Sequence, residues 1–336
     1  MKRILVVAAL LTLVVSICVV GQQTLETVLA RGTLIVGVNA VLPGFGALDA
    51  ATGEYTGFDI DYGRAIAAAI GVGVEFIPLT AGERLTALQT GQIDVLIRNT
   101  TWTLTRDSKD LGLDFCPTTF YDGQGFIVRK ADDINSIDDM DGATVCVTSG
   151  TTTEGNLADA FRLHELALIT QVFADTEASF GAYDVAGCDC YTSDKSQLAS
   201  LRTTAAIPGD HIILPDTISK EPLGPLVRHG DDEWFDIVKW TVFATFFAEE
   251  YGITQANAAT FDSTNPEIRR FLGLEGGMGA KLGLAEDWAV NAISAVGNYG
   301  EIYDRHLGPN GLDIPRAGSL NALWTQGGLI YCPAWR

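Results

Sequence analysis

The sequence predicts an α/β protein with two lobes. Short β-branched runs alternate with helical patterns in the first third of the chain, and the same alternation restarts after residue 125. About 315 residues follow a predicted N-terminal leader, which is more than one hydrophobic core usually supports. These observations favour two α/β units over a single larger one.

The first α/β unit is predicted from residue 33 onward. Strands are expected at 33–39, 74–78 and 93–97, and a helix with small residues on its packing face at 61–70. Thr80 and Glu83 have capping-box spacing, which predicts a helix that begins there and continues to residue 90. Strands that alternate with helices are expected to pair in parallel, with helices on both faces.

The second unit is expected to interrupt the first. Strands are predicted at 126–128, 143–147 and 188–192, with a helix from 154 to 163, and prolines 215, 222 and 225 mark an irregular crossing. A long helix is predicted at 233–251, and the last 90 residues are interpreted as mostly helical, with loops at 276–277 and 308–309. The predicted organisation is lobe one in 22–121, lobe two in 122–220, and in 221–336 the return to lobe one with a C-terminal helical extension.

The N-terminus has the layout of a secretory signal peptide, assigned to residues 1–21. Two basic residues precede an apolar run at 4–20, and small or polar residues follow it at 21–23. An uncleaved anchor is the alternative, but no basic stop-transfer cluster follows. Lipidation at Cys18 is not favoured, because the residues at 15–17 place no small residue directly before the cysteine. The mature protein is predicted to be soluble, with no membrane span.

Charge and cysteine content narrow the function further. The chain carries 22 Lys+Arg against 42 Asp+Glu, a balance that argues against nucleic-acid partners. Five cysteines follow the leader, so in an oxidising compartment some should pair and at least one stays free. The Cys188 and Cys190 pair is interpreted as part of a structural disulfide rather than a metal or redox site. Cys146 is one candidate partner, and the Cys146–Cys188 pairing is favoured.

Catalytic and metal motifs are missing from the sequence. His164-Glu165 begins like a zinc-protease motif, but Leu168 stands where the second histidine would be needed. No nucleophile elbow and no phosphate loop appears. We therefore predict no catalytic residue, no metal and no cofactor.

Polar residues instead follow the predicted strands, at the sheet edge where open α/β sheets bind ligands. Arg106 follows the strand at 93–97, and its guanidinium is suited to grip a carboxylate. Thr151 and Thr152 precede a helix whose N-terminal amides favour an anion, while Asp194 would take a cation. Each residue also has a simpler interpretation: Thr151 and Glu154 fit a capping box, and a lone arginine or aspartate is usually a surface residue.

Several segments resemble the family-3 solute-binding proteins of polar amino-acid ABC transporters. These segments are TGFDID at 56–61, YDGQG at 121–125 and GTT at 150–152. Others are similar to the general L-amino-acid-binding branch of that family: NTTWTLTRD at 99–107, LGLDF at 111–115, ISKEPLGP at 218–225, DWAVN at 287–291 and VGNYGEIY at 296–303. The resemblance covers nearly the whole mature chain. It implies the type II periplasmic-binding-protein fold, with the ligand between two lobes joined by a two-crossing hinge.

The same resemblance implies roles for individual residues. Arg106 would hold the α-carboxylate of the ligand, and Asp194 its α-ammonium. Thr101, Thr151 and Thr152 match residues that hydrogen-bond the ligand, and the carbonyl of Asn99 would face the ammonium. Recognition of the ligand side chain would fall to Asn39, Leu42, Ala81 and Glu83, with Arg84 and Arg98 nearby.

The implied function is a monomeric periplasmic receptor that closes on a free L-amino acid and delivers it to an ABC permease. Many family members place aromatic residues near Leu42 and Ala81, so their absence here implies a wider pocket and broad specificity. Arg84 and Arg98 hint at Glu, Gln, Asp or Asn as ligands, although Arg98 is by default interpreted as a surface salt-bridge partner. One alternative is an arogenate or prephenate dehydratase on the same fold, with Glu83 or Glu154 as proton donor. Another is the ligand-binding half of a sensor or channel.

Overall fold

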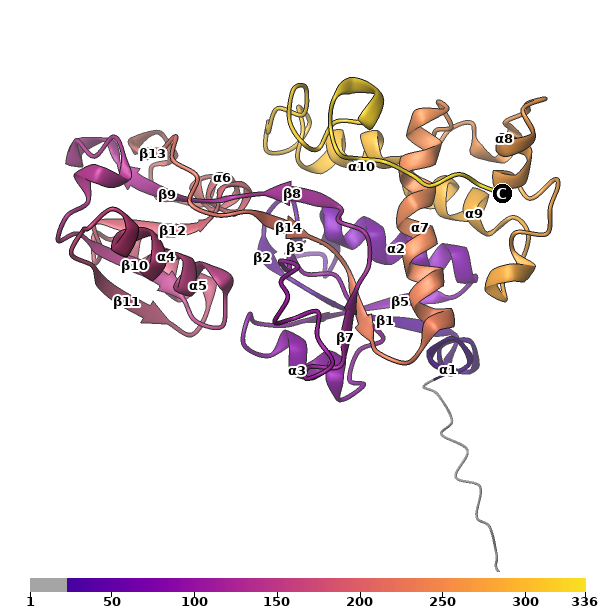
Figure 1. Cartoon of the computed structure of the whole chain (residues 1–336), viewed down its shortest axis with the longest axis horizontal. Coiled ribbons are helices and arrows are strands. Elements are labelled where there is room, and N and C mark those ends of the chain that lie inside the picture. The colour runs from indigo at the N-terminus through magenta and orange to yellow at the C-terminus, as the bar shows by residue number, and fades with distance from the viewer. Residues whose placement is uncertain (1–22) are drawn as a thin grey trace, which may run out of the picture.

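The computed structural model describes residues 23–336, so the predicted signal peptide lies outside the described residues. Figure 1 shows two α/β lobes that are joined by extended strands. Lobe one contains the N-terminal third and the C-terminal third of the described chain, and lobe two is built from the residues between them. No helix in the described part is long and apolar enough to cross a membrane.

Lobe one is built on a five-stranded sheet of order β5-β1-β6-β15-β7. The first three strands pair in parallel, as predicted, whereas the last two run antiparallel to their neighbours because they border the crossings between the lobes. The strands are β1 (Thr33–Val38), β5 (Gly73–Pro78), β6 (Val95–Leu96), β7 (Leu113–Phe115) and β15 (Leu226–Arg228). A small hairpin sheet precedes the first long helix and comprises β2 (Val41–Leu42), β3 (Gly46–Leu48) and β4 (Tyr55–Thr56).

Helices of lobe one come from both ends of the described chain. The first part supplies α1 (Thr24–Arg31), α2 (Phe58–Ile70) and α3 (Arg84–Gln89), and the return supplies α7 (Asp232–Glu250), α8 (Pro266–Phe271), α9 (Trp288–Val296) and α10 (Tyr299–His306). Helix α2 packs against α9, α7 and α10, which binds the C-terminal region to the sheet. The apolar faces of these helices form one large core around Trp234, Phe58 and Tyr299.

Two of the helix predictions differ from the structure. The side chain of Glu83 accepts hydrogen bonds from the Thr80 amide (3.0 Å) and hydroxyl (2.7 Å), but α3 begins only at Arg84. The segment 307–336, which we call the C-terminal segment, is largely irregular, so the mostly helical interpretation is wrong there. Recurrent glycines and prolines explain this difference, since both disfavour helix interiors. Short 3-10 helices lie at Lys130–Asp132, Ile137–Asp139, Pro208–Asp210, Ala258–Thr260, Ala280–Leu282 and Trp324–Gln326.

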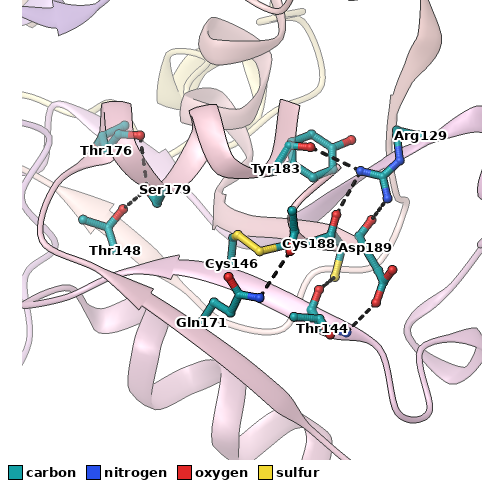
Figure 2. The surroundings of a disulfide bond; sticks show 12 residues. Arg129, Thr144, Cys146, Thr148, Gln171, Thr176, Ser179, Tyr183, Cys188 and Asp189 are labelled. Atoms are coloured by element: carbon teal, nitrogen blue, oxygen red, sulfur yellow. Dashed lines mark hydrogen bonds between the residues drawn. A yellow bond between two sulfur atoms is a disulfide. The ribbon is translucent and has the colours of Figure 1, made fainter. Parts of the chain in front are cut away.

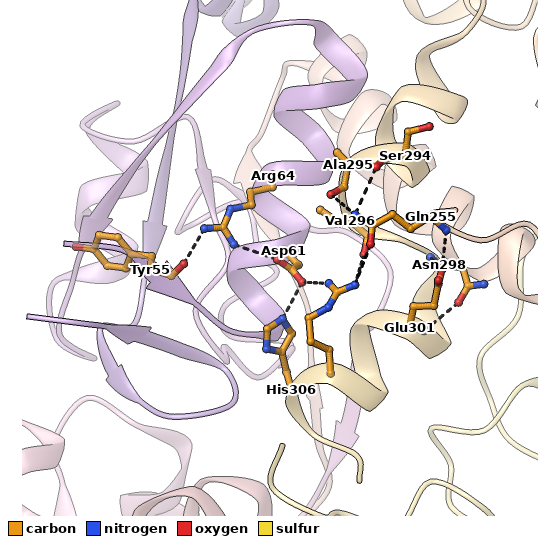
Figure 3. Close-up of polar contacts among 11 residues, drawn as sticks. Tyr55, Asp61, Arg64, Gln255, Ser294, Ala295, Val296, Asn298, Glu301 and His306 are labelled. Atoms are coloured by element: carbon orange, nitrogen blue, oxygen red, sulfur yellow. Dashed lines mark hydrogen bonds and ion pairs between the residues drawn. The ribbon is translucent and has the colours of Figure 1, made fainter. Parts of the chain in front are cut away.

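Asp61 of α2 fixes α10 to its own helix through two basic side chains of α10, and a third, Arg64, binds it from within α2 (Figure 3). Its carboxylate contacts His306 at 2.7 Å, Arg305 at 2.5 Å and Arg64 at 3.1 Å. Burial alone would raise the pKa of Asp61, but His306 and Arg305 outweigh burial and hold that pKa below its ordinary value. This ionised carboxylate joins residues about 240 positions apart in the chain, and it secures the C-terminal region against lobe one.

Lobe two contains a second five-stranded sheet of order β11-β10-β12-β9-β13. The first three strands are parallel, and β9 and β13 are antiparallel additions. The strands are β9 (Gln124–Arg129), β10 (Thr144–Thr148), β11 (Ile169–Phe173), β12 (Cys190–Asp194) and β13 (His211–Ile213), and the helices are α4 (Thr152–Leu163), α5 (Thr176–Asp184) and α6 (Lys195–Arg202).

A disulfide between Cys146 and Cys188 supports this sheet (Figure 2), which confirms the favoured pairing. It joins β10 to the residues just before β12, where Arg129 donates hydrogen bonds to the carbonyls of Tyr183 and Cys188. The remaining described cysteines, Cys116, Cys190 and Cys332, are free and buried.

The lobes are joined by a two-stranded antiparallel sheet of β8 (Phe120–Asp122) and β14 (Glu221–Leu223). Tyr121 pairs with Pro222, and Asp122 pairs with Glu221. The chain therefore leaves lobe one along β8 and returns along β14, side by side.

Candidate functional site

A cavity with an empty volume of about 330 Å³ lies between the two lobes. Most of the residues that we predicted as ligand contacts line it, although they come from four separate stretches of chain. Its lining comprises Ala81, Arg84, Arg98, Asn99 and Thr101 from lobe one, and Thr151, Thr152, Thr153, Thr176, Ser193, Asp194 and Gln197 from lobe two. The carboxyl ends of β6, β10 and β12 meet here, as expected for an open parallel sheet.

The lobe-one wall is the loop that follows β6. Asn99 has a positive φ of 31°, and its amide donates to the buried carboxylate of Asp59 at 2.7 Å, which fixes this unusual turn. Thr101 forms an isolated bridge with Leu223 of the hinge. Arg106 donates to the Thr101 carbonyl at 3.1 Å. Its guanidinium is therefore buried directly beside the threonine that lines the cavity, although Arg106 is not itself a lining residue.

The lobe-two wall is formed by the first turn of α4. The Thr151 hydroxyl donates to the Thr148 carbonyl at 2.7 Å, and no side chain caps the α4 amides. The alternative that Thr151 and Glu154 form a capping box is therefore wrong. The N-terminal amides of this twelve-residue helix, with its positive dipole end, remain able to bind an anion in the cavity.

Asp194 ends β12 and places a buried carboxylate on the same wall. Burial raises the pKa of Asp194, and the nearby carboxylates of Asp122 and Glu221 raise it further, whereas Arg84 and Arg106 oppose the rise. A ligand cation beside Asp194 would relieve this repulsion. The site thus offers an anion position and a cation position a short distance apart.

Two further arginines line the cavity. Arg84 and Arg98 are each only 4% exposed, so the interpretation of Arg98 as a surface salt-bridge partner is wrong. Arg98 donates from Nε to the Leu79 carbonyl at 2.6 Å, whereas Nε of Arg84 has no hydrogen-bond partner. Burial lowers the pKa of both, that of Arg98 to about 10, and each lies close enough to other guanidiniums to be destabilised by them. The cavity wall therefore carries positive charge that an anionic group would compensate.

Two predicted contacts, Asn39 and Glu83, line a second cavity beside the first. This cavity has an empty volume of about 510 Å³, and it shares Ala81, Arg98 and Thr176 with the first, so the two lie side by side. Leu42 is not brought to either cavity: it is fully buried in the lobe-one core, and its neighbour Val41 lines the outer cavity instead. Val41 and Leu42 form the two-residue strand β2, so their side chains point to opposite faces: Val41 faces the outer cavity and Leu42 faces the core.

Glu221 was not among our predicted site residues. It is 1% exposed, and its carboxylate accepts hydrogen bonds from Thr152 Oγ1 (2.9 Å), Asn156 Nδ2 (2.7 Å) and Ser219 Oγ (2.5 Å). A glutamate in the hinge thus positions the first turn of α4. The sequence contained no spacing signal for this contact, because Glu221 and Thr152 are 69 residues apart.

The lobes touch each other around the cavity. The side-chain Nδ2 of Asn99 donates to Gln197 Oε1 at 3.1 Å, and the Ser200 hydroxyl donates to the Pro43 carbonyl at 2.6 Å. Because each contact joins one lobe to the other, the structure represents a closed arrangement. In the part of the chain that the structure describes, no group of His, Cys, Asp and Glu side chains could hold a metal ion.

Comparison with known proteins gives consistent matches. Residues 34–266 match the bacterial extracellular solute-binding proteins, family 3. The general L-amino acid-binding periplasmic protein AapJ of Rhizobium johnstonii is 50% identical over 344 residues, covering 100% of both chains. The glutamate/glutamine/aspartate/asparagine-binding protein BztA of Rhodobacter capsulatus is 50% identical over 321 residues, 94% of each. A solved periplasmic binding protein of an ABC transporter from Brucella ovis, with glutathione bound, is 50% identical with a TM-score of 0.90, over 93% of this chain and 99% of that one.

Proposed function

The chain belongs to the bacterial extracellular solute-binding proteins of family 3, and from this premise we propose that its cleft binds free L-amino acids for an ABC importer. The observation that carries the proposal is the inter-lobe cavity, whose wall holds the uncapped N-terminal amides of α4 and the carboxylate of Asp194, with the buried Arg106 guanidinium bound to the carbonyl of the lining residue Thr101. An α-amino acid carries one anion and one cation on the same carbon. Opposite charges fixed close together are what such a zwitterion requires when it is buried.

In this proposal each lobe supplies part of the contact set. The α-carboxylate binds Arg106 and Thr101 in lobe one and the Thr151 and Thr152 amides in lobe two. The α-ammonium binds Asp194, and the Asn99 carbonyl faces it. Only the closed arrangement completes both sets of contacts, so the ligand shifts the equilibrium between open and closed receptor towards the closed form. The closed receptor then delivers its ligand to the membrane permease.

We propose that the cavity prefers Glu, Gln, Asp and Asn among the amino acids. Arg84 is suited to meet the terminal carboxylate or amide oxygen of these side chains, because its Nε has no partner within the protein. BztA, whose name states these four ligands, is a relative at 50% identity. The outer cavity beside Ala81, with Asn39 and Glu83 on its wall, leaves room for longer side chains and so supports a broad specificity.

The dehydratase alternative is not favoured. Close relatives are named as binding proteins of ABC transporters, and Glu83, one nominated proton donor, already accepts two hydrogen bonds from Thr80. Because AapJ is named as a periplasmic protein, we further propose that the mature chain acts in the periplasm. We also propose that it acts as a monomer.

A thermal-shift screen of the ligand-stripped mature protein tests the function. Common L-amino acids, citrulline and arogenate would be added singly, since a ligand that binds only the folded state raises the melting temperature. We expect shifts with many L-amino acids, largest for Glu, Gln, Asp and Asn, and none in an Asp194→Asn variant. If no amino acid raised the melting temperature, the proposal would be wrong. Analytical ultracentrifugation of the same sample would test whether the protein is monomeric, as proposed.

A further inference from the structure

The two hinge strands, β8 and β14, exchange hydrogen-bond partners in lobe one for partners in lobe two at a single position of the hinge sheet. On β8, residues up to Tyr121 are bound to lobe one and its C-terminal region. Tyr299 donates its hydroxyl to the Thr119 carbonyl at 3.0 Å, and Asn321 pairs with Tyr121. The next residues are bound to lobe two: the Ser196 amide donates to the Asp122 carboxylate at 3.2 Å, and the Lys195 amide donates to the Gly123 carbonyl at 2.9 Å.

The returning strand β14 changes partners at the same position. The side chain of Glu221 binds Thr152 and Asn156 of lobe two, whereas the carbonyl of Pro222 accepts from the Trp102 amide of lobe one at 2.8 Å. Glu221 is paired with Asp122, and Pro222 is paired with Tyr121. On both strands, therefore, the change from lobe-one partners to lobe-two partners falls between these two neighbouring residue pairs. A rotation of the lobes about this position breaks none of these bonds, because each of them stays within one side.

Asn321 holds the lobe-one side of this position on β8. Its side chain accepts the Tyr121 amide at 2.7 Å and donates to the Tyr121 carbonyl at 3.0 Å, so it occupies the strand edge that β14 leaves free. Asn321 is itself 4% exposed. The carboxamide therefore substitutes for a third strand of the hinge sheet.

Arg316 in turn fixes Asn321 to the body of lobe one. Its Nε donates to the Asn321 carbonyl at 2.9 Å, and its two terminal nitrogens bind both oxygens of Glu249 on α7 at 2.6 and 2.8 Å. The guanidinium also stacks on Tyr299, with 4.7 Å to the ring centroid. A two-point ion pair with a stacked face is a rigid support. Both Arg316 and Asn321 lie outside the residues that match the family.

We propose that Asn321 is a positioning residue of the hinge, which confines lobe rotation to the step between the Tyr121–Pro222 and Asp122–Glu221 pairs. The inference rests on the proposed function, in which closure binds the ligand. With β8 held to lobe one as far as Tyr121, the open receptor samples a restricted set of lobe orientations. Less conformational freedom is then lost on closure, so ligand affinity is higher.

Asn321→Ala tests this role, with Asn310→Ala as the matched control in an exposed part of the same segment. In the ligand-free protein, the Tyr121 amide should exchange with solvent roughly tenfold faster in Asn321→Ala than in the control. Small-angle scattering should show a larger radius of gyration for ligand-free Asn321→Ala, and the same radius as the control when ligand is bound. The Kd for the best amino acid should rise roughly fivefold.

Unchanged exchange at Tyr121 together with an unchanged ligand-free radius would overturn the proposal. If Asn321→Ala does not fold, wild-type exchange decides instead: the Tyr121 amide should be protected equally with and without ligand, and rapid exchange in the ligand-free form would contradict a fixed β8. The exchange and scattering of ligand-free protein do not require any ligand to be known. Failure of amino-acid binding would therefore be distinguishable from failure of this inference.

Discussion

Thr101 and Thr152 face each other across the cleft, with their hydroxyl oxygens 3.4 Å apart. One belongs to the loop after β6 in lobe one and the other to the first turn of α4 in lobe two. Arg106 binds the carbonyl of Thr101, and Glu221 accepts from the hydroxyl of Thr152, so both threonines are held by buried charges. Closure therefore brings the two halves of the proposed carboxylate site into contact.

Arg106→Ala should abolish tight amino-acid binding. The ligand carboxylate would be buried without its guanidinium partner, which costs about 3–5 kcal/mol. Isothermal titration calorimetry with the best ligand from the thermal screen measures this loss. The control is Arg162→Ala on α4, because the Arg162 side chain is 78% exposed and its removal should leave Kd unchanged. Near wild-type affinity in Arg106→Ala would contradict the assigned role.

Arg84→Met should separate ligand selectivity from stability. We expect glutamate binding to weaken by about 1.5–3 kcal/mol, the usual size of a hydrogen bond to a charged group, while alanine binding changes little. The ligand-free protein should melt at a higher temperature, because a buried guanidinium beside other arginines is replaced by an uncharged, unbranched apolar side chain. Equal losses for glutamate and alanine would show that Arg84 does not read the ligand side chain.

The cleft carboxylates should make stability and binding respond to pH in opposite directions. Burial and neighbouring carboxylates raise the pKa of Asp194, and burial raises the pKa of Asp122 from 3.8 to about 6. Because the folded protein holds these protons more tightly than the unfolded chain does, protonation stabilises the folded state. This contribution to the free energy of unfolding is fully present below pH 3.8, the ordinary pKa of an aspartate, and is lost as the pH rises through the raised pKa values of the folded state. Relative to wild type, ligand-free Asp194→Asn should therefore gain stability as pH rises.

Amino-acid binding should weaken on acidification, because the ligand ammonium needs an ionised Asp194. Calorimetry in two buffers of different ionisation enthalpy should detect proton release on binding at pH values where Asp194 is protonated in the ligand-free protein, because burial and neighbouring carboxylates raise its pKa there. Thermal melts of ligand-free wild type and ligand-free Asp194→Asn across the same pH range measure how the stability of each protein depends on pH. Equal pH dependence of the two ligand-free proteins would argue against a raised pKa at Asp194.

Loss of the Cys146–Cys188 disulfide should destabilise lobe two. The bond closes a loop with a sequence separation of 42, for which chain-entropy arguments give about 4 kcal/mol. The double variant Cys146→Ser with Cys188→Ser should lower the midpoint of denaturant unfolding under oxidising conditions. Cys190→Ser is the control, since Cys190 is buried nearby but unpaired, and dithiothreitol should destabilise it as it does wild type.

Local sequence patterns predicted much of the architecture. Alternation of β-branched runs with helical stretches located the three parallel strands of the lobe-one sheet and, in lobe two, β10 and β12, because buried strands and amphipathic helices are specified by their own residues. It did not locate β11, whose residues are mostly exposed, and the strand predicted at 126–128 is antiparallel to β12. Strand ends located Arg106, Thr151, Thr152 and Asp194 for the same reason, since the loop after a parallel strand must reach the ligand edge. Resemblance to the family then supplied roles that spacing alone left open.

Tertiary structure decided what depends on distant partners. Whether Arg98 is buried, whether Leu42 or Val41 faces the cleft, and how Glu221 and Asn321 hold the hinge were not readable from local sequence. Burial of a long polar side chain depends on what packs over it, and these partners lie up to 200 residues away in the chain. The sequence thus determined the elements and the types of charge at their ends. The packing of two lobes and a C-terminal segment determined which of those charges meet.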